Sequence, residues 1–93
     1  MPDKLLLSYD VGTTFLKTSL MDTKFKTLGS EFDKYGIYFP KKGCVEQDAL
    51  EWWNKVVETT SKLVQEKKVD ASKIVSLVFG GQALSTVLIN RDG

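Results

Sequence analysis

The residues best suited to do chemistry lie in a short turn near the start of the chain, at residues 10–14. The turn and its flank supply a carboxylate, a glycine, two hydroxyls and an ammonium, which belong to Asp10, Gly12, Thr13, Thr14 and Lys17. Glycine lets the backbone bend and a ligand approach, while backbone N–H groups and hydroxyls donate to phosphate oxygens. Mg²⁺ takes few carboxylates and many waters. The turn therefore predicts a phosphate and Mg²⁺ site, with an ordinary Asp-Gly hairpin turn as the alternative.

The composition excludes several other kinds of site. The chain has no histidine, so the commonest general base and zinc ligand are absent. Cys44 is the only cysteine, so no intrachain disulfide or thiolate cluster can form, and we interpret it as a small, partly buried side chain. The net charge of +1 gives no electrostatic case for nucleic acid or an anionic membrane. No apolar run resembles a signal peptide or a membrane span, and we expect a cytoplasmic protein.

The elements that must position the turn are predicted by apolar patterns. Apolar runs on either side of it predict two strands, residues 4–10 and 14–22, joined as a hairpin. The first is apolar on both faces, which is typical of a central strand. Residues 27–34 alternate only in part and predict a weaker third strand at the edge of the sheet. The three strands would form an antiparallel meander.

A helix is predicted over residues 49–67. Asp48 suits the N-cap, and Glu51 at the third helical position completes a variant of the capping box. Apolar side chains recur at helical spacing and define the face expected to pack on the sheet; they are Leu50, Trp53, Val57, Thr60 and Val64, with Trp52, Val56 and Leu63 widening the stripe.

Two further strands are predicted, over residues 73–79 and 85–90. The first follows a long helix, so it is a candidate parallel strand reached by a right-handed crossover. With 93 residues, the chain makes at most one small α/β domain.

Three patches of the sequence carry a resemblance to a known family. They are residues 9–14 with Lys17, residues 43–48 with the tryptophan-containing stretch 50–53, and residues 79–82 with 87–93. Together they resemble the N-terminal portion of the FGGY family of carbohydrate kinases, which includes xylulokinase and glycerol kinase. The middle patch is the most specific, because a Val-Glu-Gln-Asp loop before a Trp-rich helix is not expected in actin or the heat-shock chaperone ATPases.

The resemblance implies a partial ribonuclease-H-like domain of the actin-like ATPase superfamily. Members of the family are several times longer and hold ATP and sugar in a cleft between two such domains. Residues 1–93 would then be the N-terminal part of the first domain. The catalytic aspartate would lie beyond Gly93, so no catalytic residue is expected in this chain and the isolated chain is expected to be inactive.

The resemblance also assigns roles to residues of the turn. Asp10 matches the Mg²⁺-organising aspartate. Gly12, Thr13 and Thr14 match the turn that faces the ATP phosphates. Lys17 matches a basic position that can balance phosphate charge, with a solvated strand lysine as the alternative.

A second group of residues matches the segment that contacts the sugar. Gln82 matches a glutamine there, with a polar cap on a buried strand as the alternative. Ala83 and Leu84 depart from the Met-His of xylulokinase-like proteins and the Arg-Glu of glycerol kinases, and neither side chain can hydrogen-bond a hydroxyl. Gln82, Ala83 and Leu84 are therefore the expected sugar-contacting residues, and they do not identify the sugar.

The predicted function is that of an ATP-dependent kinase which transfers the γ-phosphate to a hydroxyl of a sugar or polyol, a pentulose such as xylulose being favoured. The alternatives are a non-catalytic ribonuclease-H-like interaction module and an actin-like ATPase. The expected ligands are ATP, Mg²⁺ and a small sugar or polyol, without nucleic acid or membrane. A meander with one helix leaves a sheet face uncovered, so we expect self-association or association with the rest of the parent chain.

Overall fold

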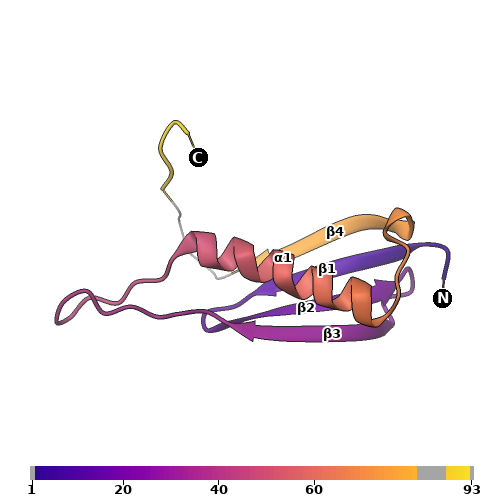
Figure 1. Cartoon of the computed structure of the whole chain (residues 1–93), viewed down its shortest axis with the longest axis horizontal. Helices are drawn as coiled ribbons and strands as arrows, with labels where there is room; N and C mark the ends of the chain where they lie inside the picture. The colour runs from indigo at the N-terminus through magenta and orange to yellow at the C-terminus, as the bar shows by residue number, and fades with distance from the viewer. Residues whose placement is uncertain (1, 82–87, 93) are drawn as a thin grey trace.

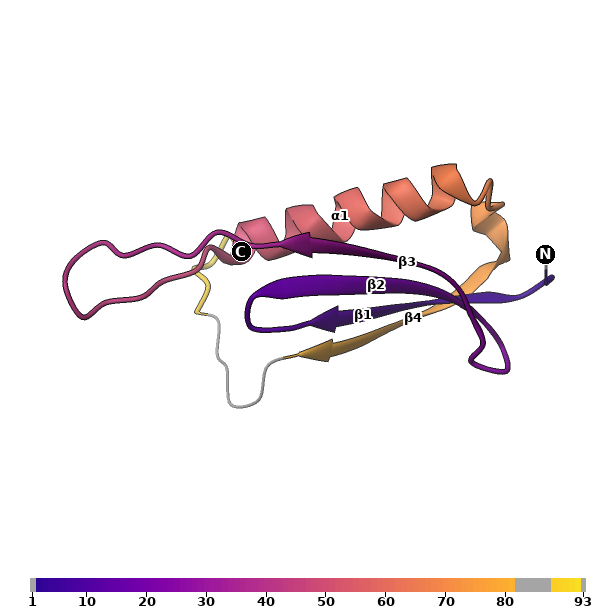
Figure 2. The same ribbon diagram turned by 90° about the horizontal axis from the view of Figure 1, so that it is seen from below.

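The computed structural model describes residues 2–81 and 88–92, which form a mixed sheet covered on one face by a helix (Figures 1 and 2). The elements in chain order are β1 (Leu5–Val11), β2 (Phe15–Asp22), β3 (Thr27–Lys34), α1 (Ala49–Glu66), the short 3₁₀ helix η1 (Ala71–Lys73) and β4 (Ile74–Gly81). The strand order is β3-β2-β1-β4. β2 is antiparallel to both β1 and β3, whereas β4 is parallel to β1.

The predicted architecture is confirmed for the meander, the helix and the parallel strand. β1 lies in the interior of the sheet and β3 at its edge, as the apolar patterns indicate. The prediction of a strand over residues 85–90 is not confirmed by the described residues. Residues 85–87 lie outside the described residues, and residues 88–90 are not in a strand.

The core lies between α1 and the sheet. Alternate residues of β1 (Leu5, Leu7 and Tyr9) are buried beneath the helix, as are Leu16 and Leu20 of β2. Side chains alternate between the faces of a strand, so one face of the hairpin is apolar and the other is left open. Figure 2 shows the helix layer above the sheet layer, and no other described element covers the far face of the sheet.

The helix uses a different face from the one that its apolar spacing predicted. Val56, Thr59 and Leu63 are buried, and Trp52 and Val64 pack partly against the core. Leu50, Trp53 and Val57 are instead exposed by 71%, 58% and 47%. The reason is that α1 lies over β2 and β3 rather than over β4, which leaves one apolar flank of the helix without a partner in the described residues.

Hydroxyl groups tie α1 to the sheet. Thr59 donates to the Lys55 carbonyl (2.8 Å), so it is Thr18 of β2 that donates to Thr59 Oγ1 (2.8 Å). Both side chains are buried, at 0% and 2% exposure. In the same way the Tyr9 hydroxyl donates to Thr60 Oγ1 (2.6 Å), because Thr60 donates to the Val56 carbonyl (2.7 Å).

Among the described residues no helix combines the length and the apolar character needed to cross a lipid bilayer.

The buried threonine pair generates a stability prediction. Thr59→Val keeps the shape of the side chain but leaves the buried Thr18 hydroxyl without its acceptor, so we expect a loss of about 1–3 kcal/mol in the free energy of unfolding, measured by chemical denaturation. The double variant Thr18→Val with Thr59→Val removes both groups and should recover much of that loss. Fully additive losses in the double variant would contradict coupling between the two hydroxyls.

Candidate functional site

The turn of residues 10–14 joins β1 to β2 at the end of the sheet where α1 begins (Figure 1). The Gly12 N–H donates to the Phe15 carbonyl oxygen (3.1 Å) and closes the hairpin. A Cβ atom at Gly12 would lie 3.0 Å from that same backbone oxygen. A larger residue at position 12 would require the Phe15 carbonyl to shift, so the close approach of the two backbone segments favours glycine there.

Asp10 lies on the open face of the sheet, opposite to α1. This follows from alternation, since its neighbour Tyr9 is buried under the helix. Asp10 is exposed, with Lys17 of β2 on one side and Gly80 of β4, which adds no side chain, on the other. Among the described residues, no hydrogen bond or ion pair occupies its carboxylate. The carboxylate is thus accessible from solvent at the end of the central strand.

A single carboxylate of this kind fits Mg²⁺ bound together with a nucleotide. The described residues contain no cluster of three or more acidic, cysteine or histidine side chains that could hold a metal ion by themselves. Mg²⁺ commonly takes one or two carboxylates, phosphate oxygens and waters instead of a cage of protein ligands. Asp10, beside the turn predicted to face phosphate, has the donor chemistry for that arrangement.

The Lys17 side chain leans toward the other neighbouring strand. Its ammonium lies over the ring of Phe32 in β3, 5.4 Å from the ring centroid, and does not form an ion pair with Asp10. A cation held on an aromatic face keeps its charge near the open face. The phosphate-balancing role predicted for Lys17 is untested by this contact.

The two threonines of the turn are held by their backbone carbonyls. The Gln47 side-chain amide donates to the Thr13 carbonyl (2.6 Å), and the Tyr35 N–H donates to the Thr14 carbonyl (3.1 Å). Thr13 and Thr14 are exposed, and within the described part of the chain no partner occupies their hydroxyls. The hydroxyls predicted to face phosphate are therefore available, while the backbone behind them is fixed.

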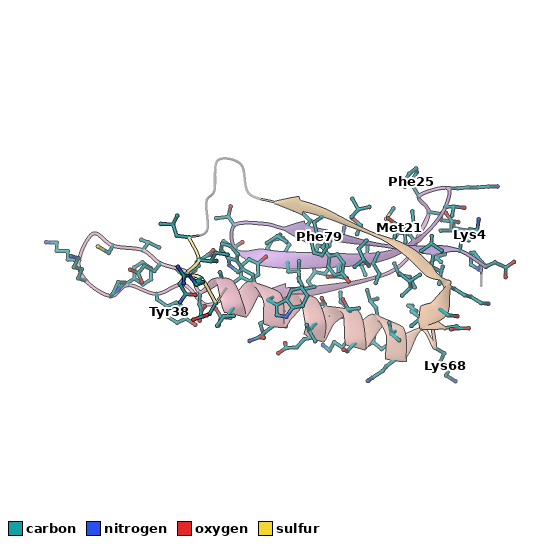
Figure 3. The ribbon with its side chains drawn as sticks, turned by 90° about the horizontal axis from the view of Figure 1, so that it is seen from above. Lys4, Met21, Phe25, Tyr38, Lys68 and Phe79 are labelled. Carbon is teal, nitrogen blue, oxygen red and sulfur yellow. The ribbon has the colours of Figure 1, made fainter. Side chains whose placement is uncertain are left out.

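The loop of residues 35–48 that supplies these contacts is itself attached to α1. Asp48 caps the helix by accepting from the Leu50 N–H (3.0 Å), which confirms the predicted N-cap. The capping box is wrong, because the Glu51 carboxylate does not return to the cap. It accepts instead from the Gly36 N–H (2.9 Å) and the Tyr38 hydroxyl (2.9 Å), as a bridge from the helix to the loop. Figure 3 shows Tyr38 beside the start of the helix.

Two tyrosines of this loop have raised pKa values. Hydrogen bonding to Glu51 is the main cause of the raised pKa of Tyr38. Burial is the main cause for Tyr35, and the Asp10 carboxylate adds to it. The Tyr35 ring is 6% exposed and lies 6.1 Å from the Trp52 ring, and neither the Tyr35 hydroxyl nor Trp52 Nε1 has a partner among the described residues. Two buried donors without a described partner thus belong to rings that lie close to each other.

The bridge made by Glu51 can be tested directly. In Glu51→Ala, the pKa of Tyr38 should fall toward its ordinary value, and exchange of the Gly36 amide hydrogen should accelerate by at least about tenfold, as measured by NMR. A raised pKa stabilises the fold below the ordinary tyrosine pKa and loses that contribution as the pH rises through the raised value. The alkaline loss should therefore shrink in the variant.

Glu58→Ala is the matched control, because Glu58 lies on the same helix and pairs with Lys55. If Glu58→Ala changes Tyr38 and Gly36 as much as Glu51→Ala does, or if neither variant changes them, the loop does not depend specifically on the Glu51 bridge.

The predicted sugar-contacting residues Gln82, Ala83 and Leu84 lie outside the described residues. Among the described residues, a wide hollow of about 480 Å³ lies on β2 and β3 and is lined by Phe15, Phe32, Asp33 and Lys34. Sequence reasoning singled out the stretch that contains Gln47 as distinctive, but it gave Gln47 no task. The spacing from the turn to Gln47 carries no signal that the two meet.

Comparison with known proteins shows which family has this sequence and fold. A family model described as the FGGY family of carbohydrate kinases, N-terminal domain, matches residues 5–93. The chain belongs to the FGGY family of carbohydrate kinases. A glycerol kinase of Alcanivorax borkumensis is 31% identical over 87 residues, which cover 94% of this chain and 18% of that protein. This FGGY chain thus spans less than a fifth of the length of that relative.

Solved structures give the same picture of the fold. A ligand-bound xylulose kinase from Lactobacillus acidophilus superposes with a TM-score of 0.74 at 32% identity, over 85% of this chain and 16% of that one. A gluconate kinase from the same organism matches with a TM-score of 0.74 and 32% identity, over 85% of this chain and 15% of that one. The fold is therefore that of the N-terminal part of these kinases, a partial ribonuclease-H-like domain of the actin-like ATPase superfamily.

Proposed function

We propose that residues 1–93 are the N-terminal part of the first domain of an ATP-dependent carbohydrate kinase, which transfers the γ-phosphate of ATP to a hydroxyl of a sugar or polyol. The observation that carries the proposal is the exposed Asp10 carboxylate beside a glycine turn in a chain of the FGGY family, where no described residue occupies the threonine hydroxyls. A cytoplasmic location is part of the same proposal.

Asp10 would hold Mg²⁺, directly or through its waters, and the bound ion would neutralise charge on the phosphates. Gly12 lets the phosphates approach the backbone, and the Thr13 and Thr14 hydroxyls and nearby backbone N–H groups donate to phosphate oxygens. Lys17 adds positive charge on the same face. Catalysis of phosphoryl transfer consists mainly of such positioning and charge stabilisation. The base that accepts the sugar proton would come from polypeptide outside this chain.

The proposed acceptor is a pentulose such as xylulose. The likeness to the xylulose kinase of L. acidophilus supports this acceptor. The chain also resembles a gluconate kinase and a glycerol kinase, so gluconate and glycerol are the alternative acceptors. Gln82, Ala83 and Leu84 are the residues proposed to contact the acceptor. Since Ala83 and Leu84 offer no side-chain hydrogen bond, they would contribute shape rather than polar recognition of hydroxyls.

The kinase proposal is tested with the full-length polypeptide, including any segments that precede or follow residues 1–93. ADP release should depend on D-xylulose more than on gluconate or glycerol, and Asp10→Ala should lower the rate by at least about 100-fold through loss of the metal ligand. Asp3→Ala, an exposed carboxylate near the N-terminus, is the control and should leave the rate unchanged.

Residues 1–93 alone should release no sugar-dependent ADP. Turnover by residues 1–93 well above that of its Asp10→Ala variant would contradict the assignment of the base to another segment. Absence of any ATP-dependent activity in the wild-type polypeptide would favour the non-catalytic interaction module.

We also propose that polypeptide outside residues 1–93 covers the surfaces which α1 leaves open. On the helix side, Trp53, Val57, Leu77 and Phe79 help to line an open groove of about 240 Å³ between α1 and β4. On the opposite face Val78 of β4 is 52% exposed, and β4 also has an unpaired edge among the described residues. Apolar patches and free strand edges of this kind are usually covered.

For the isolated chain, the expected result is self-association and binding of an apolar dye, measured by light scattering and fluorescence. Leu77→Lys and Val78→Lys charge the two faces of β4 separately, so the variant with the larger effect identifies the face in contact. Phe39→Lys, at a 71% exposed position in the loop, is the control. A monomer at high concentration without dye binding would contradict the proposal.

A further inference from the structure

The turn of residues 10–14 accepts a hydrogen bond from a side chain to which the proposed function gives no role. The Gln47 amide nitrogen lies 2.6 Å from the Thr13 carbonyl oxygen, although 34 positions separate the two residues. We propose that Gln47 is a positioning residue of the phosphate site, which orients the Thr13–Thr14 peptide so that its N–H faces the bound phosphates. The inference rests on the proposed function, which it deepens by naming what sets the geometry of the turn.

The first step of the argument is the geometry of the peptide bond. In a planar trans peptide, the carbonyl and the following N–H point in opposite directions. The described residues contain no cis peptide bond. Because the Thr13 carbonyl points at Gln47, the Thr14 N–H points away from Gln47. A bond to the carbonyl therefore sets the direction of the donor on the other side of the same peptide.

The second step concerns the adjoining peptide. The Thr14 carbonyl accepts from the Tyr35 N–H (3.1 Å), so it is held from the same loop. Two successive carbonyls are thus tied to residues 35 and 47, while the threonine hydroxyls remain free among the described residues. Backbone N–H groups aimed at an anion stabilise it most when they need no reorganisation on binding. Tying the carbonyls supplies that preorganisation.

The third step is the support of Gln47 itself. Its neighbour Asp48 caps α1, and its other neighbour Glu46 exchanges two backbone hydrogen bonds with Tyr38, each of 2.7 Å. Tyr38 is in turn bound to Glu51 in the first turn of α1. Gln47 is therefore attached on both sides to a helix packed on the core, and a functional geometry is held best from such rigid elements.

The chemistry requires a donor at position 47. A backbone carbonyl only accepts hydrogen bonds, so the atom of Gln47 that faces Thr13 is the amide nitrogen. A carboxylate of the same shape has no hydrogen to donate when ionised and would be repelled by the carbonyl. Glutamate at this position should thus turn the peptide away, whereas a change to leucine only removes the bond.

The test uses Gln47→Glu and Gln47→Leu in the polypeptide as it is made in the cell. Loss of one neutral hydrogen bond should raise the KM for ATP by about threefold to tenfold in Gln47→Leu, with the KM for the sugar unchanged. Gln47→Glu should raise it further, because it combines the lost bond with repulsion. Gln65→Glu and Gln65→Leu are matched controls at an exposed position near the end of α1, and should leave both constants unchanged.

A second readout does not depend on ATP. Amide hydrogen exchange of Tyr35, which donates to the Thr14 carbonyl, should accelerate in the Gln47 variants and not in the Gln65 variants. Faster exchange at Tyr35 together with a raised KM for ATP supports the inference. Unchanged exchange, or faster exchange with an unchanged KM for ATP, overturns it.

The two proposals can fail separately. If the wild-type polypeptide binds no ATP, as measured by calorimetry, the proposed function is wrong. In that case the hold of Gln47 on the turn is still judged by exchange at Tyr35 in the Gln47 and Gln65 variants, and its phosphate role is rejected.

Discussion

The burial of alternate residues of β1 beneath α1 is the constraint on which the site depends. Leu5, Leu7 and Tyr9 are almost fully buried, so the side chains between them must lie on the other face. Asp10 comes one residue after Tyr9 and is therefore exposed on the open face at the end of the strand. A shift of β1 by one residue would bury the carboxylate under the helix, at a large cost in desolvation. The apolar core thus determines on which face of the sheet the Asp10 carboxylate lies, and with it the proposed phosphate and metal site.

A second set of contacts connects that chemistry to the helix. The turn has little core of its own, since Gly12, Thr13 and Thr14 are not buried. Its backbone is held by Gln47 and Tyr35, and the loop that carries both is attached to α1 by Glu51 and Asp48. Polar side chains at the start of the helix are therefore connected to the turn through this loop, although they contact neither Asp10 nor the threonine hydroxyls.

The surfaces left uncovered follow from the position of the helix over β2 and β3. β4 pairs with β1 and stacks Phe79 on Tyr9 at 4.6 Å between ring centroids, but α1 does not extend over it. Apolar side chains on the flank of α1 and on both faces of β4 consequently remain exposed, among them Trp53, Leu77 and Val78. The same arrangement explains the unused face of the helix, because an apolar stripe shows that a face can be buried without showing against which strand.

The sequence by itself determined the local features of this protein. Alternating and helical apolar patterns predicted β1, β2, β3, α1 and β4 within a few residues, and the turn glycine and the Asp48 cap followed from local backbone chemistry. Only the tertiary structure decided which flank of α1 is buried, that Glu51 bridges to the loop instead of closing a capping box, and that Gln47 meets Thr13. The physical reason is that periodicity and capping act over a few residues, whereas these contacts join segments that meet only after α1 has packed on the sheet.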